Sequence, residues 1–111
     1  MIIYEVNIAV DLAIQERFLV WLKEHVAQVL EFDGFSRVML YILEEVEDSD
    51  PLKLYLVLHY HVGSKNDLKN YLNQHAPAKK RAMIELFGNR LNLANRTLVG
   101  IPEGKFTRRE I

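Results

Sequence analysis

Residues 2–11 read IIYEVNIAVD, and every second position of this stretch is apolar. An apolar row at period two is typical of a β-strand with one buried face. The stretch LKLYLVLHYHV at residues 52–62 carries a second row of the same kind on its even positions. The first row consists of Ile2, Tyr4, Val6, Ile8 and Val10, and the second of Leu52, Leu54, Leu56, Leu58, Tyr60 and Val62. The two rows predict two strands that each bury one face in the core.

The apolar period becomes helical after the first strand, from Leu12 to about Glu31. Apolar side chains there recur at about 100° per residue, which predicts an amphipathic helix with one buried stripe. Asp11 is expected to cap this helix, and Asp33 and Gly34 are expected to end it. The stripe consists of Ile14, Phe18, Trp21, Leu22, His25, Val26 and Val29.

Two further strands and a second helix complete the expected elements. Ser64 and Asp67 have the spacing of a capping box, so a helix is expected to begin beside them. Pro77 is expected to break or bend that helix, because proline has no N–H group and its ring obstructs the preceding turn. The acidic stretch EEVEDSDP is interpreted as a solvated hairpin loop. The expected elements are a strand at 35–46, the acidic loop at 44–51, a helix at 65–87 and a strand at 89–99.

The order of these elements is βαββαβ, which predicts an α+β fold of the ferredoxin-like kind. Right-handed crossovers would place the first and third strands in the centre of a four-stranded antiparallel sheet, with two helices on one face. The two cleanest apolar rows belong to these two strands, as this topology requires. We therefore expect one domain at residues 1–99, followed by a C-terminal tail at residues 100–111.

The composition excludes several classes of function. A chain of 111 residues fits one domain with one core. The net charge of −1 indicates neither nucleic-acid binding nor a membrane surface, and no apolar run approaches the roughly 18 residues of a membrane helix. The chain has no cysteine, which excludes disulfides, thiol catalysis and cysteine metal sites. The N-terminus lacks a basic leader, so we expect a soluble, cytoplasmic protein.

The sheet face opposite the helices is expected to carry a mixture of apolar and polar side chains. The two central strands contribute Ile3, Asn7, Ala9, Tyr55, Val57 and His59 to it. Such a face is too apolar to remain wholly in water, and a two-fold contact with a second copy would cover it. We therefore predict a homodimer whose two sheets lie face to face, which is a dimeric α/β barrel. The alternative is a monomer with an exposed sheet.

Four short motifs are spread over nearly the whole chain: YEVN (4–7), WLKEH (21–25), HAP (75–77) with a base after it, and FG (87–88) leading to RTL (96–98). In these motifs the chain resembles a family of small bacterial proteins of unknown function. That family belongs to the dimeric α/β-barrel superfamily. The resemblance therefore implies the fold and the dimer, and it implies no activity.

The same superfamily contains antibiotic-biosynthesis monooxygenases and haem-degrading enzymes, which hold a small ligand between the helices and the sheet. In the haem-degrading branch, an asparagine of the first strand, a tryptophan and a histidine of the second helix line the pocket. Asn7 and His75 resemble two of these three residues. The stretch that would hold the tryptophan reads LHYHVGS (58–64), and Trp21 lies on the first helix instead. This departure argues against haem, and we expect no cofactor.

Four side chains are expected to converge between the first helix and the sheet. Trp21 and His25 lie one turn apart on the helical stripe, and Tyr4 and Tyr60 lie on the helix-facing rows of adjacent strands. Apolar walls with a few polar tips are typical of small-molecule sites. Histidine can serve there as acid, base or ligand anchor, because its unperturbed pKa of roughly 6.5 is near neutral pH. The alternative is an aromatic core in which these groups only pack.

The second helix and the third strand supply further candidates. His75 falls on the buried stripe of the helix and is a second candidate base. A helix restarted at Pro77 would free N–H groups beside Lys80 and make a modest anion site; the alternative is a solvated basic flank. His59 and His61 share the open sheet face, but two ligands are a weak signal of zinc, and we predict no metal site.

Three hypotheses about function remain. The first is a dimer that binds a small molecule between helices and sheet through Tyr4, Trp21, Tyr60 and Lys80. The second is a cofactor-independent enzyme of the monooxygenase or isomerase type, with one of the two candidate histidines as its base. The third is a protein-interaction dimer with a filled core. An open space between the helices and the sheet would favour the first two hypotheses over the third.

Overall fold

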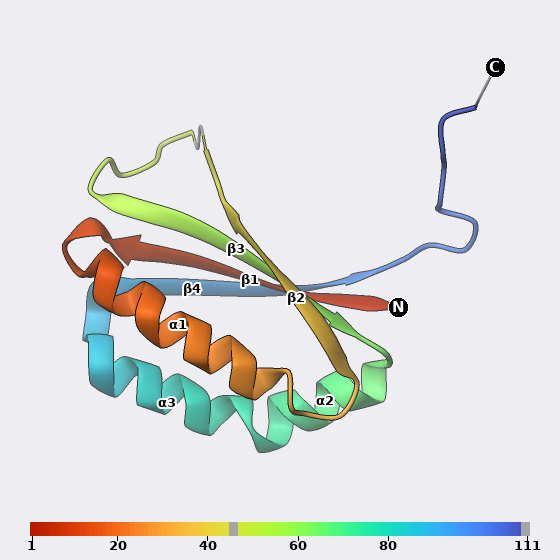
Figure 1. The fold of residues 1–111 in the computed structure, drawn as a ribbon, viewed down its shortest axis with the longest axis horizontal. Coiled ribbons are helices and arrows are strands. Elements are labelled where there is room, and N and C mark those ends of the chain that lie inside the picture. Colours follow the sequence, from red (N-terminus) through yellow and green to blue (C-terminus); the bar gives the residue numbers. More distant parts are fainter. Residues whose placement is uncertain (45–46, 110–111) are drawn as a thin grey trace.

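The computed structural model describes residues 1–44 and 47–109. In this part of the chain four strands form one antiparallel sheet and three α-helices pack beside it (Figure 1), so the fold is mixed α/β. The strands are β1 (Ile2–Asp11), β2 (Phe35–Ile42), β3 (Lys53–Val62) and β4 (Leu91–Val99). The helices are α1 (Gln15–Val29), α2 (Lys65–Gln74) and α3 (Ala76–Phe87), with short 3₁₀ turns at Leu12–Ile14 and Gly88–Arg90. None of the helices in these two ranges has the length and apolar run that crossing a membrane requires.

The strand order of the sheet is β2-β3-β1-β4, so β1 and β3 are the central strands. This position confirms the prediction drawn from their two apolar rows. Tyr4 lies opposite Tyr60, and Ile8 lies opposite Leu56, in the antiparallel register of these strands. Residues directly opposite each other point to the same face, so the two rows combine into one apolar surface. Leu52, predicted as the first member of the second row, lies before β3 and is 71% exposed.

The three helices cover this apolar surface, and no helix of the described residues lies on the opposite face of the sheet (Figure 1). The most deeply buried side chains come from α1 and the two central strands: Val10, Phe18, Leu22, Val29, Leu58 and Val62. Burying a large apolar side chain contributes roughly 1.5–3 kcal/mol. The core therefore lies where the helical stripe of α1 meets the period-two rows, as both patterns predict.

The predicted break of the second helix near Pro77 is confirmed: the segment forms two helices, α2 and α3, so three helices pack on the sheet where two were expected. α2 ends at Gln74, and His75 leaves the helical conformation with a φ of −121°. Pro77 then lies in the first turn of α3, where its missing N–H group has no helical partner to lose. The break precedes the proline because the proline ring obstructs the turn before it.

The predicted start of α2 beside Ser64 is confirmed, with Ser64 as its N-cap. The Ser64 hydroxyl accepts a hydrogen bond from the Asp67 N–H at 3.1 Å and donates one to the Asp67 carboxylate at 2.9 Å. The predicted cap at Asp11 is wrong: its side chain makes no capping hydrogen bond, because Asp11 is still paired with Lys53 in the sheet. β2 ends at Ile42, before its predicted boundary. Residues 45–46 of that strand and of the acidic loop lie outside the described residues.

The tail after β4 runs away from the sheet (Figure 1). Residues 100–109 contain no helix or strand, and the side chain of Phe106 is 88% exposed. β4 ends at Val99, which is the boundary expected between the domain and the tail. Residues 110–111 of the tail lie outside the described residues.

Gly34→Ala is expected to destabilise the fold far more than Gly100→Ala. Gly34 has a φ of +83°, and an added Cβ would overlap the Asp67 carboxylate, whereas at Gly100 it would meet open space. The left-handed conformation alone costs a residue with a Cβ about 1–2 kcal/mol, and the overlap adds to this. Urea denaturation should show a loss of at least about 2 kcal/mol for Gly34→Ala and about 0.5 kcal/mol or less for Gly100→Ala. Equal losses in the two variants would contradict this account of the turn.

Candidate functional site

A cavity of about 360 Å³ lies between the helices and the sheet. Three strands (β1, β3 and β4) form its floor, and all three helices contribute to its walls. Its volume falls in the range of small-molecule pockets, roughly 300–1,000 Å³. The predicted ligand-binding residues line it together with one candidate base: Tyr4, Trp21, His25, Tyr60 and Lys80.

Trp21 and His25 form one flat wall of the cavity. Their ring centroids are 4.7 Å apart and their planes differ by 16°, because residues four apart lie one above the other on a helix. Trp21 also meets the ring of Phe87 edge-on, with centroids 5.6 Å apart. Burial lowers the pKa of His25 to about 4, and the positive charge of Lys79 adds to this effect. The imidazole of His25 is therefore neutral at pH 7.

Three tyrosines are the most buried polar residues of the cavity lining. Tyr4, Tyr60 and Tyr71 are 6%, 2% and 6% exposed, and the ring of Tyr4 lies 6.1 Å from that of Tyr60 and 6.4 Å from that of Tyr71. No hydrogen bond joins their hydroxyls to any other described residue. Burial raises the pKa of Tyr71 to about 12 and also raises the pKa of Tyr4 and Tyr60. All three hydroxyls are therefore protonated and able to donate.

Two lysines bring positive charge to the cavity from the first turns of α3. Lys79 is half-buried; its Nζ donates to the Gln28 side-chain oxygen at 3.1 Å and lies 5.5 Å from the centre of the Phe32 ring. Lys80 is exposed and also lines the cavity. Within residues 1–44 and 47–109, no Asp or Glu lines the cavity or forms an ion pair with either lysine. The described lining therefore combines hydrogen-bond donors with positive charge and contains no carboxylate.

Sequence reasoning did not select Tyr71, Lys79 or Asn95, which also line the cavity. Tyr71 and Lys79 fall on the predicted buried stripe of the second helix, so the helical period was sufficient to find them. Asn95 shares a period-two row with Leu91 and Leu93 on the helix-facing side of β4. A polar amide side chain within an otherwise apolar row was the sequence feature that could have identified Asn95 as a cavity residue.

His75 lies outside this cavity. Its ring stacks on Phe32, with centroids 4.1 Å apart, at the junction where α2 ends and α3 begins. The position of His75 therefore lends no support to a role as base for a ligand in the cavity.

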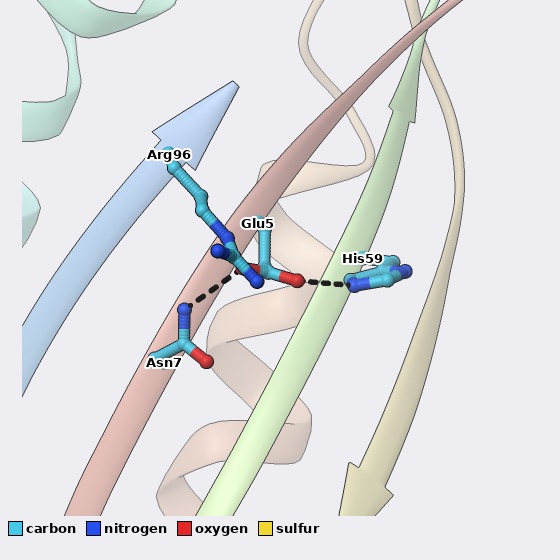
Figure 2. Close-up of polar contacts among 4 residues, drawn as sticks. All are labelled: Glu5, Asn7, His59 and Arg96. Atoms are coloured by element: carbon cyan, nitrogen blue, oxygen red, sulfur yellow. Dashed lines mark hydrogen bonds and ion pairs between the residues drawn. The ribbon is translucent and has the colours of Figure 1, made fainter. Parts of the chain in front are cut away.

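A second polar cluster lies on the open face of the sheet (Figure 2). Glu5 of β1 lies opposite His59 of β3 and Arg96 of β4. Its carboxylate accepts hydrogen bonds from Asn7 at 3.1 Å and from Arg96, and a ring nitrogen of His59 lies 2.8 Å from its other oxygen. Glu5 is 4% exposed, and the hydrogen bonds from Arg96 and Asn7 lower its pKa to about 2. The cluster therefore holds a fully ionised carboxylate.

The two histidines of β3 contact different partners on this face. His59 faces Glu5, whereas Nδ1 of His61 lies 3.2 Å from the sulfur of Met1. Across the part of the chain that the structure describes, no three His, Cys, Asp or Glu side chains gather closely enough to hold a metal ion. The cluster is best described as an ion-paired surface.

Comparison with known protein families places the chain in one of them. The family "Domain of unknown function (DUF4286)" matches residues 1–101. The chain belongs to this family. A search of curated proteins finds no match. The solved structure of "De novo designed protein Foldit4" is similar in fold, with a TM-score of 0.56 and 13% identity over 90% of this chain and 98% of that chain.

Membership of DUF4286 confirms the predicted resemblance to a family of unknown function. The relation to the wider dimeric α/β-barrel superfamily, the bacterial origin and the cytoplasmic location stay predictions. The likeness to the designed protein shows the fold alone. The function of this DUF4286 chain must therefore be argued from its cavity and its open sheet face.

His25 is expected to make the DUF4286 fold sensitive to mild acid. Its pKa of about 4 in the folded chain lies below the value of 6.5 that it regains on unfolding, so between these pH values protons bind preferentially to the unfolded chain. The stability linked to neutral His25 is complete above pH 6.5 and is lost as the pH falls toward 4.

The variant His25→Phe isolates this effect, since phenylalanine can stack on Trp21 but cannot bind a proton. Between pH 7 and pH 5 the wild type should lose on the order of 1–2 kcal/mol more stability than His25→Phe. Urea denaturation of both proteins at the two pH values measures the difference. If the stabilities of the two proteins depend on pH in the same way, burial does not lower the pKa of His25.

Proposed function

We propose that the protein is a homodimer that binds a small molecule in the cavity between its helices and its sheet. The cavity itself is the observation that carries this proposal, because side chains from three strands and three helices of the described chain meet around about 360 Å³ of open space. Trp21, Leu22 and Met83 supply apolar walls around a few polar groups. This composition is typical of small-molecule sites.

The tyrosine hydroxyls support a ligand over a filled core. Buried tyrosines in a filled core normally direct their hydroxyls to a protein partner. Tyr4, Tyr60 and Tyr71 are buried, yet among the described residues none of their hydroxyls has such a partner. Water or a ligand must complete these hydrogen bonds, which is the arrangement expected of a binding cavity.

Non-catalytic binding is favoured over a reaction in which His25 or His75 acts as the base. A general base works best when its pKa lies near the operating pH, whereas the pKa of His25 is lowered to about 4. His75 does not line the cavity. Non-catalytic binding is therefore the function that the geometry supports best.

The open sheet face supports assembly into a homodimer. Met39, Tyr41 and Leu98 are 44%, 46% and 38% exposed on this face, around the cluster drawn in Figure 2. The ring of Tyr41 lies 5.4 Å from that of His59. Two-fold symmetry allows such a patch to cover itself with a second copy. A dimer formed in this way leaves the cavity, on the other side of the sheet, free for its ligand.

Ala76→Phe is expected to abolish binding by filling the cavity. Ala76 lines the cavity at the start of α3, whereas Ala78 of the same helix does not. Trp21 is the chain's sole tryptophan, so its fluorescence reports occupancy. A fluorescence screen of small organic compounds should find binders whose affinity falls at least about tenfold in Ala76→Phe and is unchanged in Ala78→Phe. A screen without binders, or binders that tolerate Ala76→Phe, would count against the proposal.

Tyr41→Glu is expected to dissociate the dimer, and Ile84→Glu is expected to leave it intact. Tyr41 lies on the open sheet face, whereas Ile84 is 52% exposed on α3. A carboxylate within a two-fold contact is either repelled by the same carboxylate of the second copy or buried without its hydration shell. Both effects weaken association. Light scattering after gel filtration gives the mass of each variant, and circular dichroism verifies its fold. A wild type of monomer mass would refute the homodimer.

A further inference from the structure

We infer that the cavity selects a small organic anion, namely a carboxylate with an apolar body, and this inference rests on the proposed binding function. The carboxylate would bind at Lys79 and Lys80. The apolar body would pack along Trp21 and extend toward the three tyrosines. The charge of the lining, the depth of its polar groups and the shape of its walls each support this ligand class.

The charged side chains among the described lining residues are all positive. No Asp or Glu lines this cavity with Lys79 and Lys80, although Glu24 and Lys79 both line a smaller neighbouring pocket. Neither lysine forms an ion pair within residues 1–44 and 47–109. The Nζ of Lys79 donates to the neutral oxygen of Gln28, which does not line the cavity. An ammonium group has three N–H donors, so two stay available for a ligand. A cationic ligand would be repelled here, whereas a carboxylate would gain charge-assisted hydrogen bonds.

Among the polar residues of the lining, the two lysines are more exposed than the three tyrosines. Lys80 is exposed and Lys79 is half-buried, whereas Tyr4, Tyr60 and Tyr71 are at most 6% exposed. Moving a carboxylate into apolar surroundings removes its hydration at a high cost in free energy. The charged end of the ligand therefore stays at the lysines, and the uncharged part extends inward.

The inner walls of the cavity require that apolar part. The stacked rings of Trp21 and His25 form a flat surface, and Met83 on the facing helix is a side chain that adapts readily to irregular shapes. A bare inorganic anion such as phosphate would leave this surface uncovered. The protonated hydroxyls of the tyrosines can donate to a neutral oxygen at the inner end of the ligand.

The test compares acids with their uncharged amides. Benzoate, 3-phenylpropionate and octanoate are each titrated beside the corresponding amide, with the fluorescence of Trp21 as the readout. The acids should bind at least about tenfold more tightly than the amides. Added salt should weaken the binding of the acids and leave that of the amides unchanged, because salt screens charge.

The remaining outcomes separate this inference from the proposed function. If acids and amides bind equally and Ala76→Phe abolishes the binding of both, the inferred preference for an anion is refuted. The proposed binding cavity is then still supported. If neither acids, amides nor the wider screen of neutral compounds binds, both the inference and the proposed function fail.

The double variant Lys79→Met/Lys80→Met gives an independent arm. Methionine keeps much of the length of lysine but has no charge, so acids and amides should bind this variant equally, at the affinity that the wild type shows for the amides. Lys69→Met serves as the matched control, because Lys69 is an exposed lysine of α2 outside the cavity; it should keep the preference for acids. A preference for acids that survives the double variant would overturn the assignment of the two lysines.

Discussion

The antiparallel register of β1 and β3 is the constraint on which the rest of this structure depends. Because side chains alternate between the two faces of a strand, the register assigns every residue of the two strands to one face. Tyr4 and Tyr60 face the helices and line the cavity, whereas Glu5 and His59 face the other way and pair with each other. A slip of one residue would exchange these sets and place a carboxylate in the core. The cavity and the charged open face are therefore two consequences of one register.

Pro77 supplies the second constraint, since it decides how the chain between β3 and β4 covers the sheet. The break that it imposes allows α2 and α3 to direct their own apolar stripes toward the cavity, with Tyr71 from one helix and Met83 from the other. Lys79, in the first turns of α3, also lines the cavity. At the same break, the ring of His75 stacks on the ring of Phe32. A covalent property of one residue thus determines where this segment divides into two helices.

The features that could be predicted from the sequence are those that depend only on regular periods. Tyr4, Trp21, His25 and Tyr60 lie on a strand or helix at a known phase, so their convergence follows from geometry. The position of His75 could not be derived, because it depends on the backbone angles at an irregular junction. The volume of the cavity was equally inaccessible, because it is the space that facing side chains leave unfilled and is no property of any single element.

The distribution of charge also follows from the register and cannot be obtained from the net charge of −1. Glu5 lies next to Tyr4 on β1, yet the alternation of the strand directs it to the open face, where Arg96, Asn7 and His59 satisfy it. Had this carboxylate pointed inward, it would have offered a negative charge to the lysines of the cavity. Because Glu5 points to the open face, it does not neutralise Lys79, and the charge of Lys79 is available to a ligand in the cavity. The preference of the cavity for an anion is therefore a property of the sheet register as much as of the lysines themselves.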